Sequence, residues 1–197
     1  MLFTLLKARI RKRRLAQFRA GVTPVFLNLK QVKSIAFLFK LEGDADIEPA
    51  KEIIKELKST KIPVTGIIVE AAKSFKEQSL RDEFIEGTCK GNGVAFIGKK
   101  SLNWLGIPQG INEIDEFYKT KYDLVVALND NGNFTLEYLA TRSRANCIAG
   151  MENKPNMPYN IVFEQSIAHK GEHASADYVK QLLAYLKNIQ SVVTAGK

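Results

Sequence analysis

Residues 122–150 have the sequence YDLVVALNDNGNFTLEYLATRSRANCIAG, and this stretch decides the fold class. The apolar run YDLVVAL (122–128) predicts a strand, and the turn NDNGN contains the strong turn signal Asn-Gly. Asn133 is a favourable N-cap for a helix over 134–143, and ANCIAG (145–150) follows as a second strand. Strand, turn, helix and strand in this order are typical of an α/β protein.

The rest of the chain repeats this alternation. VKSIAFLFK (32–40) is a near-continuous apolar run, typical of a strand buried on both faces of a parallel sheet. IEPAKEIIKELKS (47–59) has the apolar spacing of a helix, with Asp46 as its N-cap. The other predicted elements are strands at 63–71, 93–98 and 159–164, a helix at 176–189 capped by Ser175, and mixed helix and loop at 72–92 and 99–121. We therefore predict one Rossmann-like α/β domain over residues 31–190, with a mostly parallel sheet and helices on both faces, preceded by a basic N-terminal helix.

Composition and cysteine usage exclude several classes of protein. No apolar run approaches the roughly 18 residues that span a bilayer. Cys89 and Cys147 lie far apart and form no CxxC pair, which argues against a disulfide framework or zinc site and favours a reducing, cytoplasmic compartment. His169 and His173 have the spacing of a metal pair on a helix, but Gly171 between them indicates a loop, so we expect no metal.

The net charge of +8 is concentrated near the N-terminus. The basic arm, residues 1–21, contains seven Lys and Arg residues and no acidic residue, whereas the 22 basic and 21 acidic residues of the remainder nearly cancel. Its sequence predicts a helix that ends at Gly21, with Leu2, Leu6 and Ile10 in one apolar stripe. The apolar LFTLL precedes the charges and no apolar core follows them, which argues against a secretory signal.

Three uses of the basic arm remain open. It can lie on an anionic membrane surface, contact the phosphates of RNA or DNA, or pack Leu2, Leu6 and Ile10 on its own domain. The lack of an aromatic-rich RNA-binding motif in the sequence weighs against nucleic acid. The candidate surface-docking residues are Lys7, Arg9, Arg11, Lys12, Arg13 and Arg14.

Ligands of parallel α/β sheets bind at the carboxyl ends of strands, so the turns after the strands are candidate sites. The turn at 41–46 has one glycine and several carboxylates, which would repel the pyrophosphate of NAD or FAD, and we expect no cofactor. GVAFIGKKS (93–101) nearly matches a P-loop, but Lys100 occupies the place of the magnesium-binding hydroxyl and the spacer resembles a strand. The candidate ligand-binding residues are Lys99, Lys100, Asn129, Asn131 and Asn133.

Two resemblances to known families add to these predictions. Residues 122–150 resemble a block of heptosyltransferase-like glycosyltransferases through Tyr122, Asp123, Leu124, Leu128, Asn131, Leu139, Ala140, Ala145 and Gly150. The whole chain resembles a family of small uncharacterised Bacteroides-type bacterial proteins through VKSIAFLF, KSLNWLGIP (100–108) and YDLVVAL. The first resemblance implies a nucleotide or nucleotide-sugar binding module related to the N-terminal domains of those enzymes. The second implies a cytoplasmic Rossmann-like domain and no known activity.

The sequence presents no Ser-His-Asp or Cys-His arrangement that spacing alone supports. Our leading hypothesis is therefore a non-catalytic protein that acts through interactions, with the basic arm docking on an anionic surface, the inner face of the membrane. A protein partner is a separate expectation. The alternative is nucleotide or nucleotide-sugar binding at the five candidate ligand residues. Nucleic-acid binding by the arm is the weakest of the three hypotheses.

Overall fold

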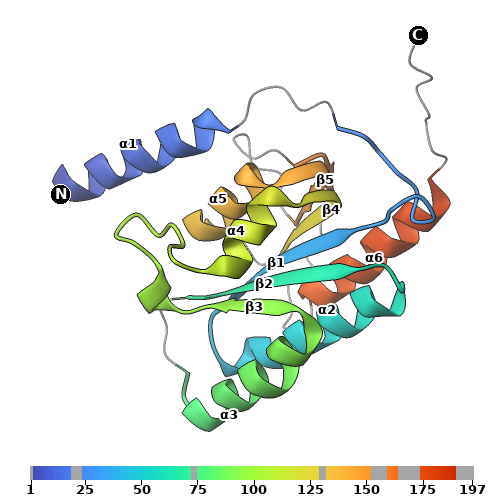
Figure 1. The fold of residues 1–197 in the computed structure, drawn as a ribbon, viewed down its shortest axis with the longest axis horizontal. Coiled ribbons are helices and arrows are strands. Elements are labelled where there is room, and N and C mark those ends of the chain that lie inside the picture. The colour runs from blue at the N-terminus through green and yellow to red at the C-terminus, as the bar shows by residue number, and fades with distance from the viewer. Residues whose placement is uncertain are drawn as a thin grey trace.

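The computed structural model describes residues 2–18, 24–71, 75–128, 132–151, 159–163 and 174–189. They form an α/β domain around one parallel sheet, with helices on both faces (Figure 1), so the predicted fold class is confirmed. The helices are α1 (Leu2–Gln17), α2 (Ile47–Ser59), α3 (Gln78–Glu83), α4 (Asn112–Lys119), α5 (Phe134–Arg142) and α6 (Ala174–Asn188). The strands are β1 (Ile35–Leu41), β2 (Val64–Glu70), β3 (Val94–Ile97), β4 (Lys121–Leu128), β5 (Arg144–Gly150) and β6 (Ile161–Val162).

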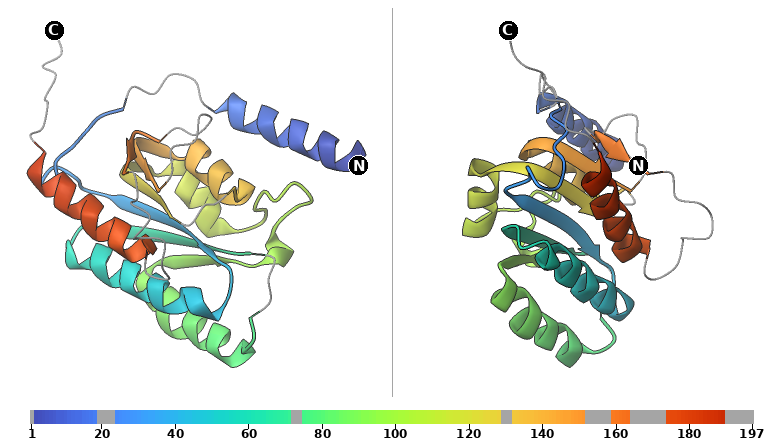
Figure 2. Two further views of the ribbon diagram at one scale, coloured as in Figure 1. Left: turned by 180° about the vertical axis from the view of Figure 1, so that it is seen from behind. Right: turned by 90° about the vertical axis from the view of Figure 1, so that its right-hand side faces the viewer.

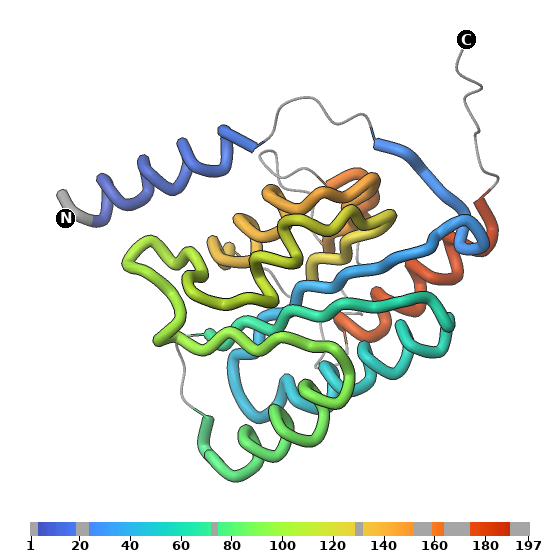
Figure 3. Tube along the Cα trace, in the orientation of Figure 1, coloured from blue at the N-terminus to red at the C-terminus, as the bar shows by residue number. Residues whose placement is uncertain are grey.

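The sheet has the strand order β3-β2-β1-β4-β5-β6, and all its described pairings are parallel. The chain builds outward from β1 to β3, returns across the sheet to β4 and then builds outward in the other direction, as the trace in Figure 3 shows. This is the strand order of a doubly wound Rossmann sheet. The point where the order reverses lies between β1 and β4, and ligands of such sheets bind beside it.

Alternation along the strands builds two cores, one on each face of the sheet. All seven residues of β1 are buried, and successive side chains of a strand point to opposite faces. Phe37 and Phe39 pack beneath α2 and α6, whereas Ala36 and Leu38 pack beneath α4 and α5. Figure 2 shows these helix pairs on opposite sides of the sheet. A central strand covered on both faces explains why its sequence is continuously apolar.

Two of the predicted helix caps differ from the structure. Asp46 occupies the N-cap position of α2, but its carboxylate accepts a hydrogen bond from the backbone N–H of Glu42 instead of capping the helix. Ser175 lies inside α6, which begins at Ala174, and its hydroxyl donates to the Met151 sulfur at 3.4 Å. Each side chain forms a hydrogen bond with a residue outside its helix, and neither supplies the hydrogen bond that ordinarily caps a helix.

The two segments predicted as mixed helix and loop, 72–92 and 99–121, consist in their described parts of short helices and turns. Between β2 and β3 the chain forms α3, a π-helical stretch (Phe84–Cys89) and a 3-10 turn (Lys90–Asn92). Between β3 and β4 it forms a 3-10 turn (Lys99–Ser101), a loop and the eight-residue α4. Such pieces are too short to show the apolar periodicity by which longer helices are recognised.

Both cysteines are free thiols buried in the core on the α2 and α6 side. Burial raises the pKa of Cys89 to about 11 and that of Cys147 to about 12. The folded state therefore holds the protons more tightly than the unfolded state, in which thiols ionise near pH 8.5. We expect the free energy of unfolding to fall between about pH 9 and pH 12, with up to about 1.4 kcal/mol per pH unit from each thiol.

Urea unfolding at a series of alkaline pH values measures this slope. A variant with both cysteines replaced by alanine is the control, and it should lose the thiol part of the slope. Native protein at pH 8 should also react slowly with a thiol reagent, because buried protonated thiols are poor nucleophiles. Rapid reaction of either thiol without denaturant would contradict the prediction.

Candidate functional site

Charged side chains lie at the carboxyl end of β1, next to the reversal point of the sheet. A Rossmann fold binds its ligand at this point. Lys40 is only 5% exposed, and its ammonium lies 2.9 Å from a carboxylate oxygen of Glu42. Burial raises the pKa of the neighbouring Asp46, although backbone hydrogen bonds and the charge of Lys40 act in the opposite direction. The described part of this edge therefore holds a lysine among carboxylates, without the glycine-rich turn that cradles a pyrophosphate.

The candidate residues Lys99 and Lys100 lie at a different place on the same edge. Both are exposed in the 3-10 turn after β3, which is an edge strand of the sheet. The strands β2 and β1 lie between β3 and β4, so three inter-strand spacings, about 14 Å, separate the ends of β3 and β4. The sheet therefore does not place these lysines beside the turn that follows β4.

That turn begins the helix α5. Asn133 is its N-cap, and the Asn133 side-chain oxygen accepts a hydrogen bond from the backbone N–H of Leu136 at 3.2 Å. The cap predicted at this position is confirmed. The other two candidate residues of the turn, Asn129 and Asn131, lie outside the described residues.

Replacing Asn133 with alanine is expected to lower the free energy of unfolding by about 1 kcal/mol, because one backbone N–H of α5 loses its partner. Asn133→Asp keeps a capping oxygen, so its stability should stay close to that of the wild type. Urea denaturation of both variants measures the difference. Equal stability of Asn133→Ala and the wild type would show that the cap contributes nothing.

A charged pair that the sequence analysis missed closes the end of β2. The Arg81 guanidinium from α3 binds Glu70 through two bonds, with Nε–Oε1 at 3.0 Å and Nη2–Oε2 at 3.3 Å. It also lies 5.0 Å from the centre of the Phe96 ring on β3. Hydrogen bonds to Glu70 raise the pKa of Arg81. The sequence feature that could have indicated this pair is Glu70, the charged last residue of the otherwise uncharged strand β2.

The second half of α1 is docked on α5. The Arg11 Nε–H donates to the carbonyl of Leu105 at 2.8 Å, and the guanidinium lies 4.5 Å from the centre of the Phe134 ring. Leu15 is buried in a small cluster with Phe134 and Tyr138. Burial lowers the pKa of Arg11, which fits a guanidinium packed against an aromatic ring and a carbonyl. Arg11 therefore binds its own domain and is not on the outer side of the helix.

Aromatic side chains extend this contact to the end of α1. The Phe18 ring packs edge-on against Tyr138 with centroids 5.9 Å apart. Arg142 of α5 lies over Phe18 and Tyr118, and one of its N–H groups donates to the Tyr138 hydroxyl at 3.1 Å. The described contacts of α1 with α5 are thus made by residues 11, 15 and 18, and Ile10 of the predicted stripe is half-buried. Leu6 is largely exposed, and the Leu2 side chain is outside the described set.

The KSLNWLGIP segment (100–108) forms a tight loop that joins α1 to α5. The Asn103 side-chain oxygen accepts hydrogen bonds from the backbone N–H groups of Leu105 and Ile107. Gly106 adopts a φ of 86°, a conformation that favours glycine, and its carbonyl accepts a bond from the Thr135 hydroxyl at 2.7 Å. Since the Leu105 carbonyl binds Arg11, this loop fixes α1 to the N-terminal end of α5.

The opposite side of α1 faces solvent. Leu5 and Leu6 are 63% and 52% exposed, and Arg9, Lys12 and Arg13 are exposed beside them. Leu5, Arg9 and Arg13 follow one another at intervals of four residues, so they share one side of the helix. Arg11 lies two residues from both arginines and so points the other way. We call Leu5, Leu6, Arg9, Lys12 and Arg13 the outer face of α1; Lys7 is half-buried and Arg14 is exposed next to Gln17.

Two further findings bear on the kind of site. Within the described residues, no group of three or more His, Cys, Asp or Glu side chains could hold a metal ion, and both histidines lie outside that part. No helix among the same residues is both long and apolar enough to cross a bilayer.

Comparison with known proteins places the chain in a family. A model of a family of unknown function, DUF6913, matches residues 5–189. The chain belongs to this family. Among solved structures, the DUF6913 chain is similar to a glycosyl transferase of family 9 from Veillonella parvula DSM 2008, with a TM-score of 0.49 and 15% identity. The similarity covers 77% of the DUF6913 chain and 41% of the transferase, so this chain spans less than half the length of that protein.

The resemblance to a family of unknown function that was expected from the sequence is therefore confirmed. The search of curated proteins gave no match to the DUF6913 chain.

Proposed function

We propose that this DUF6913 protein acts through interactions, and that the outer face of α1 docks it on an anionic membrane surface, the inner face of the bacterial membrane. The observation that carries the proposal is the exposure of Leu5 and Leu6 on a helix whose other side is held by its own domain. A helix fixed in this way presents the same residues outward at all times. Binding then costs little of the ordering entropy that a free arm would lose.

The chemistry of the outer face suits a bilayer with acidic headgroups. Two leucines at the N-terminal end can enter the boundary between headgroups and acyl chains, and the three basic residues behind them can contact acidic headgroups. The first 20 residues carry no acidic side chain that would oppose this contact. Leu5 and Leu6 are exposed because their partner, in this proposal, is a lipid surface.

The expected binding energy is that of a reversible peripheral contact. Complete burial of a leucine side chain is worth about 1.5–3 kcal/mol, so each of these half-exposed leucines can add about 1–2 kcal/mol. Each basic residue near an anionic surface adds about 1 kcal/mol. The sum is modest beside the cost of association, so we expect binding that depends on both acidic lipid and salt.

A nucleic acid is the less favourable occupant of the same face. Lys and Arg would contact phosphates of RNA or DNA, but Leu5 and Leu6 would gain nothing from a phosphate backbone. A protein partner would need a surface that is both acidic and apolar to use the basic residues and the leucines together. The lipid surface accounts for both kinds of side chain.

Vesicle flotation of the full chain tests the proposal. The protein should float with phosphatidylcholine vesicles that contain phosphatidylglycerol and should stay behind with vesicles of phosphatidylcholine alone. High salt should weaken the binding, because the basic residues are exposed. Flotation that does not depend on acidic lipid, or retention on RNA without any vesicle binding, would refute the proposal.

A further inference from the structure

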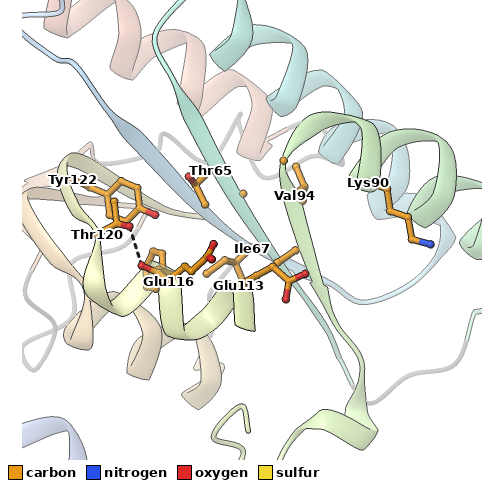
Figure 4. Close-up of a pocket in the computed structure, with 12 residues that line it drawn as sticks. Thr65, Ile67, Lys90, Val94, Glu113, Glu116, Thr120 and Tyr122 are labelled. Carbon is orange, nitrogen blue, oxygen red and sulfur yellow. Dashed lines mark hydrogen bonds between the residues drawn. The ribbon is translucent and has the colours of Figure 1, made fainter. Parts of the chain in front are cut away.

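A cavity of about 420 Å³ lies between α4 and the amino-terminal parts of β2, β3 and β4 (Figure 4). It lies at the amino ends of the strands, whereas ligands at the reversal point would bind at the carboxyl ends. None of the candidate ligand residues line it. Its apolar wall includes Ile67 of β2, Ala95 of β3 and Phe117 of α4. The volume is in the range of pockets that bind small molecules.

The charged residues at the cavity give it a negative character in a basic protein. Glu113 and Glu116 lie one turn apart on α4, both are exposed at the cavity, and neither forms an ion pair with another described residue. Lys90 is the basic lining residue, and its ammonium pairs with Glu86 at 2.6 Å. Figure 4 shows the Lys90 nitrogen at the far end of the cavity, pointing away from the glutamates.

A largely buried tyrosine also lines the cavity. Tyr122 lines the cavity and is only 3% exposed, with its ring packed on Phe117 at a centroid distance of 5.4 Å. Its hydroxyl forms no hydrogen bond with another described residue, so it can bind a ligand in the cavity. Figure 4 shows the Tyr122 ring and the Glu116 side chain on the same side of α4. The Thr120 hydroxyl nearby donates to the Glu116 carbonyl at 2.8 Å.

We propose that this cavity binds a small organic cation that carries primary ammonium groups on a short apolar chain. The ammonium groups would donate hydrogen bonds to the Glu113 and Glu116 carboxylates and to the Tyr122 oxygen. The apolar chain would lie along Ile67 and Phe117. An anion would be repelled by the two carboxylates. A neutral polyol would bring no positive charge to pair with them.

Calorimetric titration with the diamine cadaverine tests the proposal, with glutarate and pentanediol as probes of similar length and different charge. Cadaverine should bind the wild type, whereas the two other probes should not. The double variant Glu113→Gln and Glu116→Gln should bind cadaverine at least about tenfold more weakly, because each charge-assisted hydrogen bond is replaced by a neutral one. Tyr122→Phe keeps the packed ring and should weaken binding through loss of the hydroxyl alone.

The control is the double variant Glu77→Gln and Glu83→Gln, which removes the same charge from exposed positions at α3. It should bind cadaverine like the wild type. Absence of binding to the wild type, equal binding to the Glu113 and Glu116 variant, or an equal loss in the control would overturn the proposal. Vesicle binding by α1 should be the same in all these variants, so the outcome is independent of the membrane proposal.

Discussion

Reversing the charge of Arg9, Lys12 and Arg13 to glutamate is expected to lower the affinity for anionic vesicles by more than about 100-fold. Each basic residue near such a surface contributes about 1 kcal/mol, and each new carboxylate adds repulsion. All three side chains are exposed on the outer face of α1, so the substitutions leave the contacts of Arg11 and Leu15 with α5 intact. Flotation, or a titration with increasing lipid, measures the change.

A matched control separates the outer face from net charge. Lys30, Lys55 and Lys187 are exposed on other parts of the chain, and their reversal to glutamate changes the net charge by the same amount. This control should retain most of the vesicle affinity. Equal losses in both triple variants would mean that the total charge, and not α1, determines binding, and the proposed docking surface would then be wrong.

The two leucines of the outer face would account for any vesicle binding that remains after the triple charge reversal. If the triple reversal weakens binding but does not abolish it, the remaining affinity belongs to Leu5 and Leu6, and their replacement by serine should remove it. The two kinds of side chain therefore make separable contributions, which a purely electrostatic contact would not show.

The sheet could be predicted because buried parallel strands have a distinctive composition. Residues 35–41 are buried on both faces, so the sequence IAFLFKL is apolar almost throughout and includes Lys40 only at its end. The helix at 47–59 was predicted with the bounds that the structure has, because its apolar residues repeat at helical spacing over several turns. The π-helical stretch at 84–89 has no such repeat, and its place could not be predicted.

The candidate ligand site could not be assembled from the sequence, because the sequence does not contain the strand order. Lys99 follows β3 and Asn133 follows β4, and these strands are consecutive along the chain. In the sheet, β2 and β1 lie between them, since the chain returns across the sheet after β3. The sequence offers the residues after β3 and after β4 as candidates, and the topology sets the ends of these two strands apart.

Packing of α1 on its own domain was one of the alternatives left open by the sequence, but the part of Arg11 in it was not predicted, for a chemical reason. Arg11 stands among five other basic residues, so its sequence context indicates a solvated side chain. In the structure its planar guanidinium lies over the Phe134 ring and donates to a backbone carbonyl, contacts that a lysine would make less well. Burial of the apolar stripe on the domain was one of the open alternatives, and Leu6 of that stripe is exposed.

Replacing Arg81 with alanine is expected to lower the free energy of unfolding by about 3 kcal/mol. The Glu70 side chain is only 13% exposed, so removal of Arg81 leaves a largely buried carboxylate without its two hydrogen bonds. The guanidinium also joins α3 to the Phe96 ring on the edge strand β3, and this packing is lost with it. Urea denaturation of the purified variant measures the change.

Two companion variants show whether this pair is structural. Arg81→Lys keeps the charge but loses the two-pronged geometry and the stacking on Phe96, so its stability should fall between those of the wild type and the alanine variant. The double variant Glu70→Gln and Arg81→Met removes both charges and should recover much of the loss, because the unpaired carboxylate is gone. If Arg81→Ala is as stable as the wild type, the pair does not hold the end of β2 in place. Glu70 and Arg81 would then be two charged groups maintained at the carboxyl edge for another purpose, and that edge would become the next site to screen for ligands.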